Sequence, residues 1–305
     1  MTGVLAGFAT IAVIIGFGML LAHAGIVDDA GQRTLSAVAF FLASPALLFT
    51  VLQDNDVGRV FSGNLVAIVG GVVVTGAVTI TVAVARREEL GRSVIATMCS
   101  SYCNAGNLGL PIAAYALGDA ALIAPVLLLQ LLVLQPLALT VLDVAASPER
   151  PSLGRVLSRP LTNPITVASA TGLAVALSGV EVPGAVNDPL ALVGAMAVPA
   201  MLLAYGVSLR LGPLPGRGVP PGELALATGL KLLVQPAAAY AVGLLVGLDD
   251  AALLAVAVIS ALPTAQNVFV LAGRYGRAEL LARDAIFVST LGCVPVVIGI
   301  VAVLA

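Results

Sequence analysis

The sequence predicts an all-α integral membrane protein whose ten transmembrane helices form two inverted five-helix repeats. Three observations lead to this fold class. First, 60% of the 305 residues are hydrophobic and only 10% are charged, with a mean hydropathy of +1.10, whereas soluble domains carry about 25% charged residues. Second, the basic residues concentrate on one side of the predicted spans. Third, two spans are interrupted at corresponding places in the two halves.

The apolar segments define the predicted elements. A helix needs about 20 apolar residues to cross the hydrocarbon core, and ten segments meet that requirement. Short connections separate them, such as the charged stretch 86–89 and the Pro/Gly-rich stretch 212–216. The predicted spans are 3–22, 34–52, 63–85, 93–118, 121–143, 162–180, 189–210, 222–247, 250–274 and 284–304.

The distribution of basic residues predicts the orientation. Alternate loops place twelve of the fourteen Lys and Arg residues on one side, while the other side receives only Arg59 and Lys231 lies within a span. Cytoplasmic loops are enriched in Lys and Arg, so we expect a multi-pass protein of the plasma membrane with both termini on the extracytoplasmic side. The twelve are Arg33, Arg86, Arg87, Arg92, Arg150, Arg155, Arg159, Arg210, Arg217, Arg274, Arg277 and Arg283.

The halves are predicted to be repeats of opposite orientation, because each contains five helices, an odd number. Pro45 matches Pro199 and Pro111 matches Pro263, at offsets of 154 and 152 residues. Inverted-topology repeats are an architecture of secondary transporters. The predicted division is a first repeat at 1–143, a cytoplasmic linker at 144–161 and a second repeat at 162–305.

The fourth and ninth spans contain residues that interrupt a membrane helix. Segment 100–111 has two Asn, two Gly and a Pro, and segment 260–267 has Pro, Gln and Asn. Broken backbone is tolerated in a membrane only where it lines a cavity or is buried in protein. A kink repaired by the amides would explain a single proline, but a matched pair of breaks near the centre of two spans indicates a transport site.

The breaks also predict the chemistry. A half-helix that begins at a break points its positive end, with free N–H groups, toward the membrane centre. Side-chain amides there can donate hydrogen bonds to a carboxylate, while their oxygens and freed carbonyls could instead bind Na⁺, and the residues alone leave both roles open. The predicted substrate contacts are Asn104, Asn107, Gln266 and Asn267. The predicted hinge and crossover residues are Gly106, Gly109, Pro111, Pro263 and Thr264.

Three polar residues within the spans have two interpretations each. Lys231 is either functional, as ionisable residues in membranes often are, and suited to an anionic substrate, or it extends its ammonium group to the interface. Gln130 and Gln135 either line a cavity or bond between helices. No span centre carries Asp or Glu, so coupling to H⁺ would have to involve the substrate's own carboxyl or a less obvious group.

Several function classes are excluded. The single histidine and three cysteines in apolar stretches offer no metal site, and neither paired membrane carboxylates nor the H-E-x-x-H pattern of an intramembrane protease is present. We therefore expect no enzyme, no metal and no cofactor. The absence of a basic tract argues against nucleic acid binding, and the absence of a P-loop argues against an ATP-driven pump.

The motif Asn104-x-Gly106-Asn107-x-Gly109-x-Pro111, followed by the stretch 263–267, Pro-Thr-Ala-Gln-Asn, resembles the auxin efflux carrier family. That family includes plant auxin carriers and bacterial permeases assigned to malonate and other small organic acids. The resemblance runs through most of the chain. The central segment of about 18 residues is that of a compact bacterial member, since many plant carriers have a long regulatory loop there.

This resemblance implies ten helices, a scaffold domain, and a core domain in which broken helices 4 and 9 cross near the midplane. It places at the crossover, as substrate contacts or hinges, Asn104, Asn107, Pro111, Pro263 and Asn267, with Ser101 and Tyr102 as second choices. It also implies elevator-like alternating access, an architecture similar to the bile acid:sodium symporters, and a homodimer formed through the scaffold. We therefore expect a secondary active transporter for a small organic anion such as a carboxylate, coupled to H⁺ or Na⁺. The alternatives are a Na⁺-coupled symporter of the bile-acid type and a passive channel.

Overall fold

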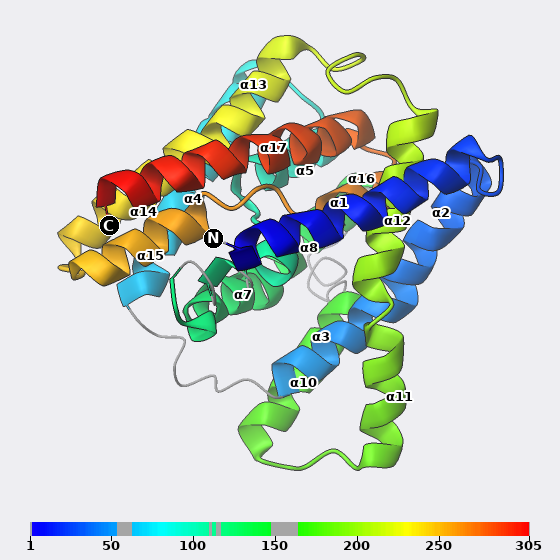
Figure 1. Cartoon of the computed structure of the whole chain (residues 1–305), viewed down its shortest axis with the longest axis horizontal. Helices are drawn as coiled ribbons and strands as arrows, with labels where there is room; N and C mark the ends of the chain where they lie inside the picture. Colours follow the sequence, from blue (N-terminus) through cyan, green and yellow to red (C-terminus); the bar gives the residue numbers. More distant parts are fainter. Residues whose placement is uncertain (1, 54–62, 110–111, 114–116, 148–163, 305) are drawn as a thin grey trace.

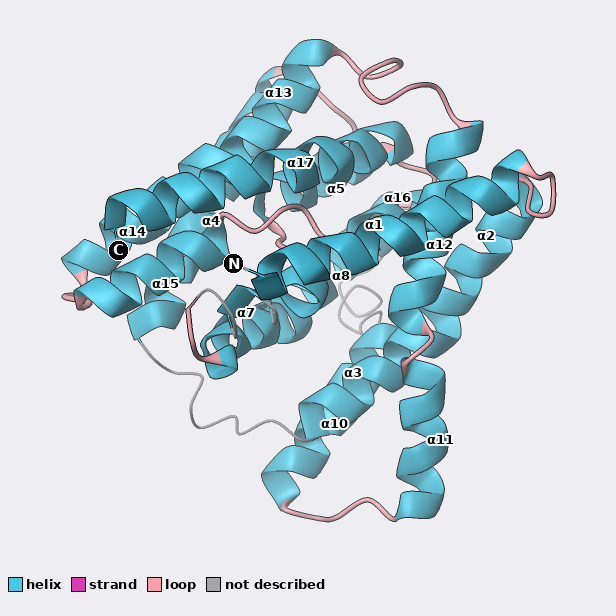
Figure 2. Cartoon of the chain, viewed as in Figure 1, coloured by secondary structure: helices cyan, strands magenta, loops and turns pink. Residues whose placement is uncertain are grey.

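A computed structural model describes residues 2–53, 63–109, 112–113, 117–147 and 164–304. These residues form helices and no β-strand (Figures 1 and 2). The elements up to residue 147 are α1 (Thr2–His23), α2 (Asp29–Val38), η1 (Ala39–Ala43), α3 (Ser44–Gln53), α4 (Gly63–Ala85), α5 (Leu90–Ser101), η3 (Ala105–Gly109), η4 (Ala120–Ile123), α7 (Ala124–Leu129), η5 (Gln130–Leu134) and α8 (Gln135–Ala145). Those that follow are α10 (Pro164–Ser178), α11 (Gly184–Gly194), α12 (Ala197–Leu211), α13 (Pro221–Gly229), η7 (Leu230–Val234), α14 (Gln235–Leu245), α15 (Asp250–Ser260), α16 (Asn267–Tyr275) and α17 (Glu279–Leu304).

Many of these elements join into longer apolar helices. Within the described ranges, six helical stretches are long and apolar enough to cross a membrane: Asp29–Gln53, Gly63–Ala85, Ala124–Ala145, Gly184–Leu211, Pro221–Leu245 and Glu279–Leu304. Shorter apolar helices cover Ala12–His23, Pro164–Ser178 and Asp250–Ser260. The described part of the chain is therefore helical, and the protein is a multi-pass membrane protein. The count of ten crossings, the inversion of the halves and the linker at 144–161 stay predictions.

Local sequence explains where several helices begin, end and bend. Asp28 and Asp249 cap α2 and α15, since each carboxylate accepts a hydrogen bond from the N–H three residues later. Gly276 ends α16 in the left-handed conformation, with φ of 62°. Three long helices contain a π segment, and in each a proline lies two residues after it: Pro45, Pro136 and Pro236. The wider π turn accommodates a ring that would otherwise clash with the carbonyl four residues earlier.

The helices pack as two bundles (Figure 1). The first bundle consists of α1, α2, η1, α3, α10, α11 and α12, in which α1 packs on α12 and α3 on α10. The second bundle consists of the described elements from α4 to α8 and from α13 to α17, in which α4 packs on α14 and α5. Glycines allow the closest approach: a Cβ atom on Gly18 of α1 would strike the carbonyl oxygen of Leu203 on α12, in keeping with small residues at membrane helix interfaces.

The two predicted breaks are confirmed, and the broken segments cross. Helix α5 ends at Ser101 and α15 at Ser260. Between the helical parts, Cys103 and Thr264 form an isolated antiparallel bridge. The backbone N–H of Asn104 donates to Pro263 O at 2.8 Å, and that of Ala265 donates to Tyr102 O at 3.2 Å. Each break therefore satisfies backbone groups of the other, which is what a membrane interior requires.

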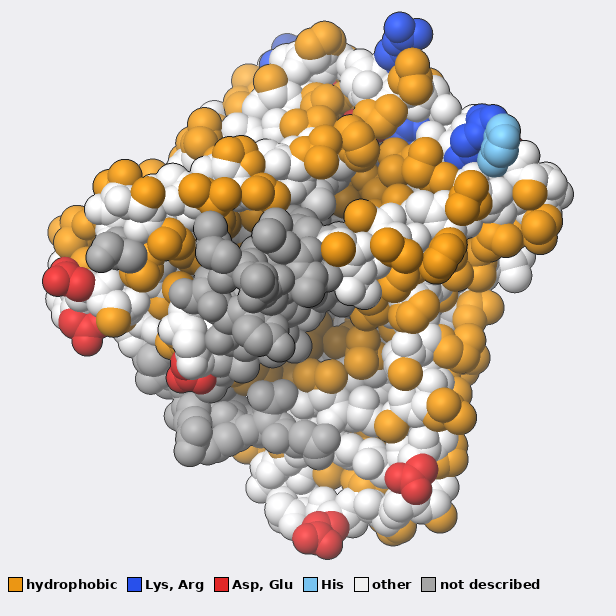
Figure 3. Space-filling view, in the orientation of Figure 1, with side chains coloured by type: hydrophobic (Ala, Val, Ile, Leu, Met, Phe, Trp, Pro, Cys, Tyr) orange, Lys and Arg blue, Asp and Glu red, His pale blue; other side chains and the backbone are white. Residues whose placement is uncertain are grey.

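Charged side chains are segregated on the surface. On the face shown in Figure 3, Lys and Arg atoms gather at the upper edge, whereas Asp and Glu atoms lie at the left and lower edges. Hydrophobic side chains cover much of the surface between them. Exposed Val and Leu residues on helix surfaces, such as Val73, Val84 and Leu291, are what lipid contact would favour.

Candidate functional site

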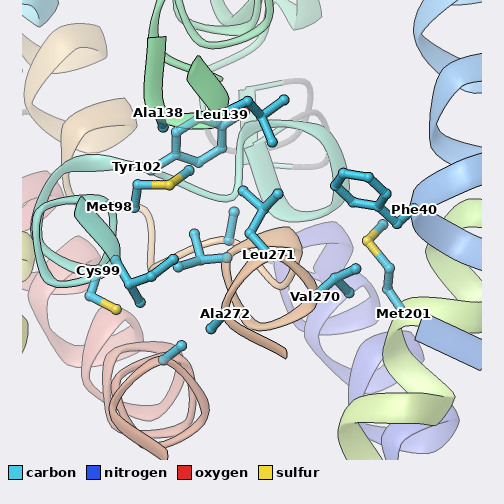
Figure 4. Packing of buried hydrophobic residues seen from close by; sticks show 14 of the residues in the cluster. Phe40, Met98, Cys99, Tyr102, Ala138, Leu139, Met201, Val270, Leu271 and Ala272 are labelled. Atoms are coloured by element: carbon cyan, nitrogen blue, oxygen red, sulfur yellow. The ribbon is translucent and has the colours of Figure 1, made fainter. Parts of the chain in front are cut away.

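A cavity of about 290 Å³ lies beside the crossing of the two broken segments. Its polar wall consists of Ser44, Tyr102, Asn104, Gln130, Gln135, Gln266 and Asn267. Its apolar wall comes from both bundles: Phe40, Leu47, Leu48, Val51, Ile165, Val198 and Met201 from the first, and Leu127, Leu131, Val270 and Leu271 from the second. In Figure 4, Phe40 and Met201 face Val270 and Leu271 of α16. The cavity thus lies between the bundles, with its amides on the second.

Amides from the two breaks are bonded to each other. Asn104 Nδ2 donates to Gln266 Oε1 at 2.6 Å, and both side chains are buried. Because one residue belongs to the fourth predicted span and the other to the ninth, the pair joins the two broken helices at the cavity wall. Buried amides must be hydrogen-bonded to avoid a desolvation cost, and this pair meets part of that requirement across the crossing.

A third amide connects both breaks to the helix that contains α7, η5 and α8. Gln135 Oε1 accepts a hydrogen bond from Tyr102 Oη at 2.7 Å and a longer one from Asn267 Nδ2 at 3.3 Å. Asn267 is the first residue of α16, so its side chain lies at the positive end of that half-helix. Asn267 Oδ1 is buried and has no hydrogen-bond partner within the described part of the chain. The cavity wall therefore contains donors from both breaks and, in Asn267 Oδ1, an acceptor that has no partner among the described residues.

Five of the predicted residues line this cavity, namely Tyr102, Asn104, Gly106, Gln266 and Asn267. Three others form the crossing or pack behind it. Pro263 supplies the carbonyl that bonds Asn104, Thr264 Oγ1 donates to Cys99 O at 2.7 Å, and Gly109 packs against Ile123 and Leu262. The Asn107 side chain and Pro111 lie outside what the structure describes.

Ser101 and Lys231 do not line the cavity. Ser101 Oγ donates to Thr97 O at 2.6 Å, back along its own helix. Lys231 is fully buried, and its ammonium donates to Gln235 Oε1 at 2.6 Å and to Ser260 O at 2.8 Å. The ammonium therefore does not reach the interface. It bonds the last carbonyl of α15, at the negative end of that half-helix, where a cation is favoured.

Gln235 extends this network to the other break. Its Nε2 donates to Ser101 O at 3.1 Å, so the last residues of α5 and α15 are joined through Gln235 and Lys231. Gln135 and Gln235 both stand directly after a π segment and before a proline. Gln135 bonds side chains at the crossing and lines the cavity, whereas Gln235 bonds the backbone of Ser101 and does not line it.

Sequence reasoning missed the apolar wall and Ser44, and it left Gln130 and Gln135 undecided. Gln135 does both things considered for it, because it lines the cavity and bonds between helices. Gln130 is buried against the cavity, and its Oε1 has no hydrogen-bond partner among the described residues. The available signal was a Gln-Pro pair inside an apolar span, where an amide needs a partner.

A helical membrane protein with an amide-lined cavity at two crossed, broken helices has the construction of a membrane transporter. Comparison with known proteins agrees. The family model described as "Membrane transport protein" matches residues 4–147 and 139–301, and the chain belongs to this family, the auxin efflux carrier family. Its class is therefore transport and not catalysis.

Two relatives match almost end to end. A protein of Rhizobium meliloti (strain 1021) named "Putative malonate transporter" is 28% identical over 298 residues, which cover 94% of this chain and 91% of that protein. A protein of Methanothermobacter thermautotrophicus named "Uncharacterized transporter" is 24% identical over 286 residues, with 92% of each chain covered.

Proposed function

We propose that this protein is a secondary active transporter that carries a small organic anion, a carboxylate, across the plasma membrane. The observation that supports it most is the cavity at the crossed helices. Two neutral donors from different breaks, Tyr102 Oη and Asn267 Nδ2, both donate there to one acceptor, Gln135 Oε1. Hydrogen bonds to charged acceptors are stronger than those between neutral groups, so a carboxylate would be well bound at the same place.

The cavity wall bears on the kind of carboxylate. Its described lining contains no Lys or Arg, and most of it is apolar. We therefore propose a monoanionic substrate with an apolar portion, either a monocarboxylate or a dicarboxylate with one carboxyl protonated. Malonate, which the name of the Rhizobium relative suggests, enters the proposal as a candidate to be compared with monocarboxylates of increasing chain length.

The two-bundle packing supports an alternating-access mechanism. The cavity lies between the bundles, and its polar groups on the second bundle face side chains such as Leu47 and Met201 on the first. Apolar side chains form few directional bonds, so one bundle can move along the other at low cost. We propose that the second bundle, the core, carries the bound substrate past the first, the scaffold, in an elevator-like movement.

We propose H⁺ rather than Na⁺ as the coupling ion. Two carbonyls at the breaks, Ser101 O and Ser260 O, accept hydrogen bonds from Gln235 and Lys231, which makes them poor Na⁺ ligands in this conformation. Asn267 Oδ1, which has no hydrogen-bond partner among the described residues, is an acceptor that a protonated carboxyl could use. In a diacid one carboxyl would then carry the proton, while the other, ionised, would accept hydrogen bonds from Tyr102 Oη and Asn267 Nδ2.

Uptake by purified protein in proteoliposomes tests this proposal. We expect saturable uptake of one or more labelled carboxylates, driven by a pH gradient and indifferent to Na⁺. Uptake that requires Na⁺ would favour the Na⁺-coupled symporter, and flux that neither saturates nor shows counterflow would favour a passive channel. No flux of any carboxylate under any gradient would contradict the proposal.

The remaining expectations are proposals too. We propose that both termini face the extracytoplasmic side, which the accessibility of terminal tags in intact cells tests. We also propose a homodimer formed through the first bundle. Exposed apolar residues on that bundle, Leu177 of α10 and Val186 and Leu192 of α11, support a partner surface, and mass measurement of the protein in nanodiscs tests it.

A further inference from the structure

Gln135 accepts hydrogen bonds from both broken segments at a single atom, its amide oxygen. One amide oxygen receives one donor from each broken segment, Tyr102 Oη at 2.7 Å and Asn267 Nδ2 at 3.3 Å. All three residues line the cavity, and Gln135 is 3% exposed. The oxygen therefore marks a point inside the cavity wall where donors from both broken helices converge.

We propose that Gln135 Oε1 occupies the position of a substrate carboxylate oxygen, and that substrate binds by displacing it. This inference rests on the proposed function, since it assumes that a carboxylate binds at the crossing. In the empty protein the amide oxygen satisfies two donors, the buried Tyr102 Oη and the partly buried Asn267 Nδ2, which would be costly to leave without a partner. A carboxylate oxygen is the stronger acceptor, so it takes both donors when it enters. Gln135 is then a competitor built into the site, and it sets the affinity for substrate.

The local chain allows Gln135 to withdraw. Its side chain has three rotatable bonds, and it directly follows the π segment η5. The neighbouring Gln130 Oε1, also in the cavity wall, has no partner among the described residues, which leaves an acceptor nearby for the displaced amide N–H₂ group.

Gln235 provides the comparison within the same chain. It also follows a π segment and precedes a proline, but its oxygen accepts from Lys231 and it does not line the cavity. Replacing Gln235 removes hydrogen bonds that join two helices. Replacing Gln135 removes such bonds too, and it also removes the oxygen that competes with substrate for Tyr102 Oη and Asn267 Nδ2. The two residues should therefore respond differently to the same substitution.

The test compares the KM of carboxylate uptake in Gln135→Met, Tyr102→Phe and Gln235→Met proteins with that of the wild type. Methionine keeps the length of glutamine without its amide, and phenylalanine keeps the tyrosine ring. We expect Gln135→Met to lower KM about three- to tenfold, because substrate no longer displaces a hydrogen bond. Tyr102→Phe should raise KM by a similar factor, because it removes a donor to substrate. Gln235→Met should not lower KM.

Opposite changes in KM in Gln135→Met and Tyr102→Phe would show that Gln135 competes with substrate. They would not be expected if the hydrogen bond only held the helices together. If the bond only held the helices together, breaking it from either end would change KM in the same direction. Equal or raised KM in Gln135→Met, with saturable wild-type uptake, would overturn this inference and leave the proposed function standing. If Gln135→Met fails to fold, Gln135→Glu decides: a fixed internal carboxylate should raise KM or abolish uptake, and a wild-type KM would overturn the inference. Absence of carboxylate uptake by the wild type would contradict the proposed function itself.

Discussion

At the residue scale, the positions of single polar side chains decide what the site can do. Asn104 and Gln266 are buried amides, Asn267 is a partly buried one, and all three, from two breaks, line one cavity. Their residue types and places were predictable, since Asn and Gln beside Pro in a membrane span are costly unless partnered. The same argument did not predict that the side chains of Lys231 and Ser101 lie away from the cavity. Their helices are apolar on most sides, so the sequence offers no polar face from which to infer their rotation.

Lys231 gives a prediction at this scale. It is fully buried and bonds Ser260 O, at the end of the helix that leads into the crossing. A buried cation acts over several ångströms, because the low dielectric of the interior screens it weakly. We expect Lys231→Met to raise the KM for an anionic substrate about tenfold.

The matched control is Thr228→Val, which removes a buried hydroxyl one turn earlier on the same helix without removing a charge. It should leave KM unchanged. If Lys231→Met also leaves KM unchanged while uptake persists, the ammonium serves only to join the ends of α5 and α15.

At the element scale, the breaks and the long helices were predictable, but their exact bounds and bends were less so. The breaks follow from Pro111 and Pro263 with their neighbouring Asn and Gly residues. The start of the second helix at Asp29 was missed by five residues, because its first turn is polar and the apolar pattern begins later. The π segments were missed as well, although in the sequence a proline stands two residues after each of the four that the structure describes, η3 included.

Close packing of α1 on α12 leads to a second prediction. A Cβ on Gly18 would strike Leu203 O, whereas a Cβ on Gly16, on the same helix, would meet nothing within 4 Å. Gly18→Val should therefore destabilise the protein by about 1–3 kcal/mol, and Gly16→Val should not. Thermal unfolding of the two purified variants in detergent measures this. Equal midpoints would mean that α1 and α12 do not pack this closely.

At the scale of the whole molecule, composition and charge distribution were enough to predict a multi-pass helical membrane protein, and the motifs were enough to indicate its family. The two-bundle packing was expected only through the family resemblance. No periodicity in the sequence distinguishes a helix face that meets another helix from one that meets lipid, because both faces are apolar.

The proposed movement of one bundle against the other predicts the effect of cross-links. Tyr205 of α12 and Phe269 of α16 lie across the bundles, with ring centroids 5.7 Å apart. In a protein whose three cysteines are replaced by alanine, linking Tyr205→Cys to Phe269→Cys with a short dithiol-reactive reagent should stop uptake. Uptake should return when a reducible linker is cleaved.

The control is a link within the second bundle, Gly76→Cys of α4 with Thr97→Cys of α5. A Cβ at position 76 would lie 3.7 Å from Thr97 Cγ2, an ordinary contact distance, so the same reagent can join the two positions. This link should leave uptake intact. Uptake that continues with the bundles linked would rule out an elevator-like movement between them.

The central claim is that the amides at the crossing bind the transported carboxylate. The most direct measurement compares saturable carboxylate uptake by Asn104→Ala and Asn187→Ala proteins in proteoliposomes. Each substitution removes one member of an amide pair bonded at 2.6 Å, Asn104 with Gln266 at the crossing and Asn187 with Gln53 away from it. The account predicts that Asn104→Ala lowers kcat/KM at least about tenfold, equivalent to ~1.4 kcal/mol, while Asn187→Ala stays near wild type. Wild-type kcat/KM in a well-folded Asn104→Ala protein would contradict it.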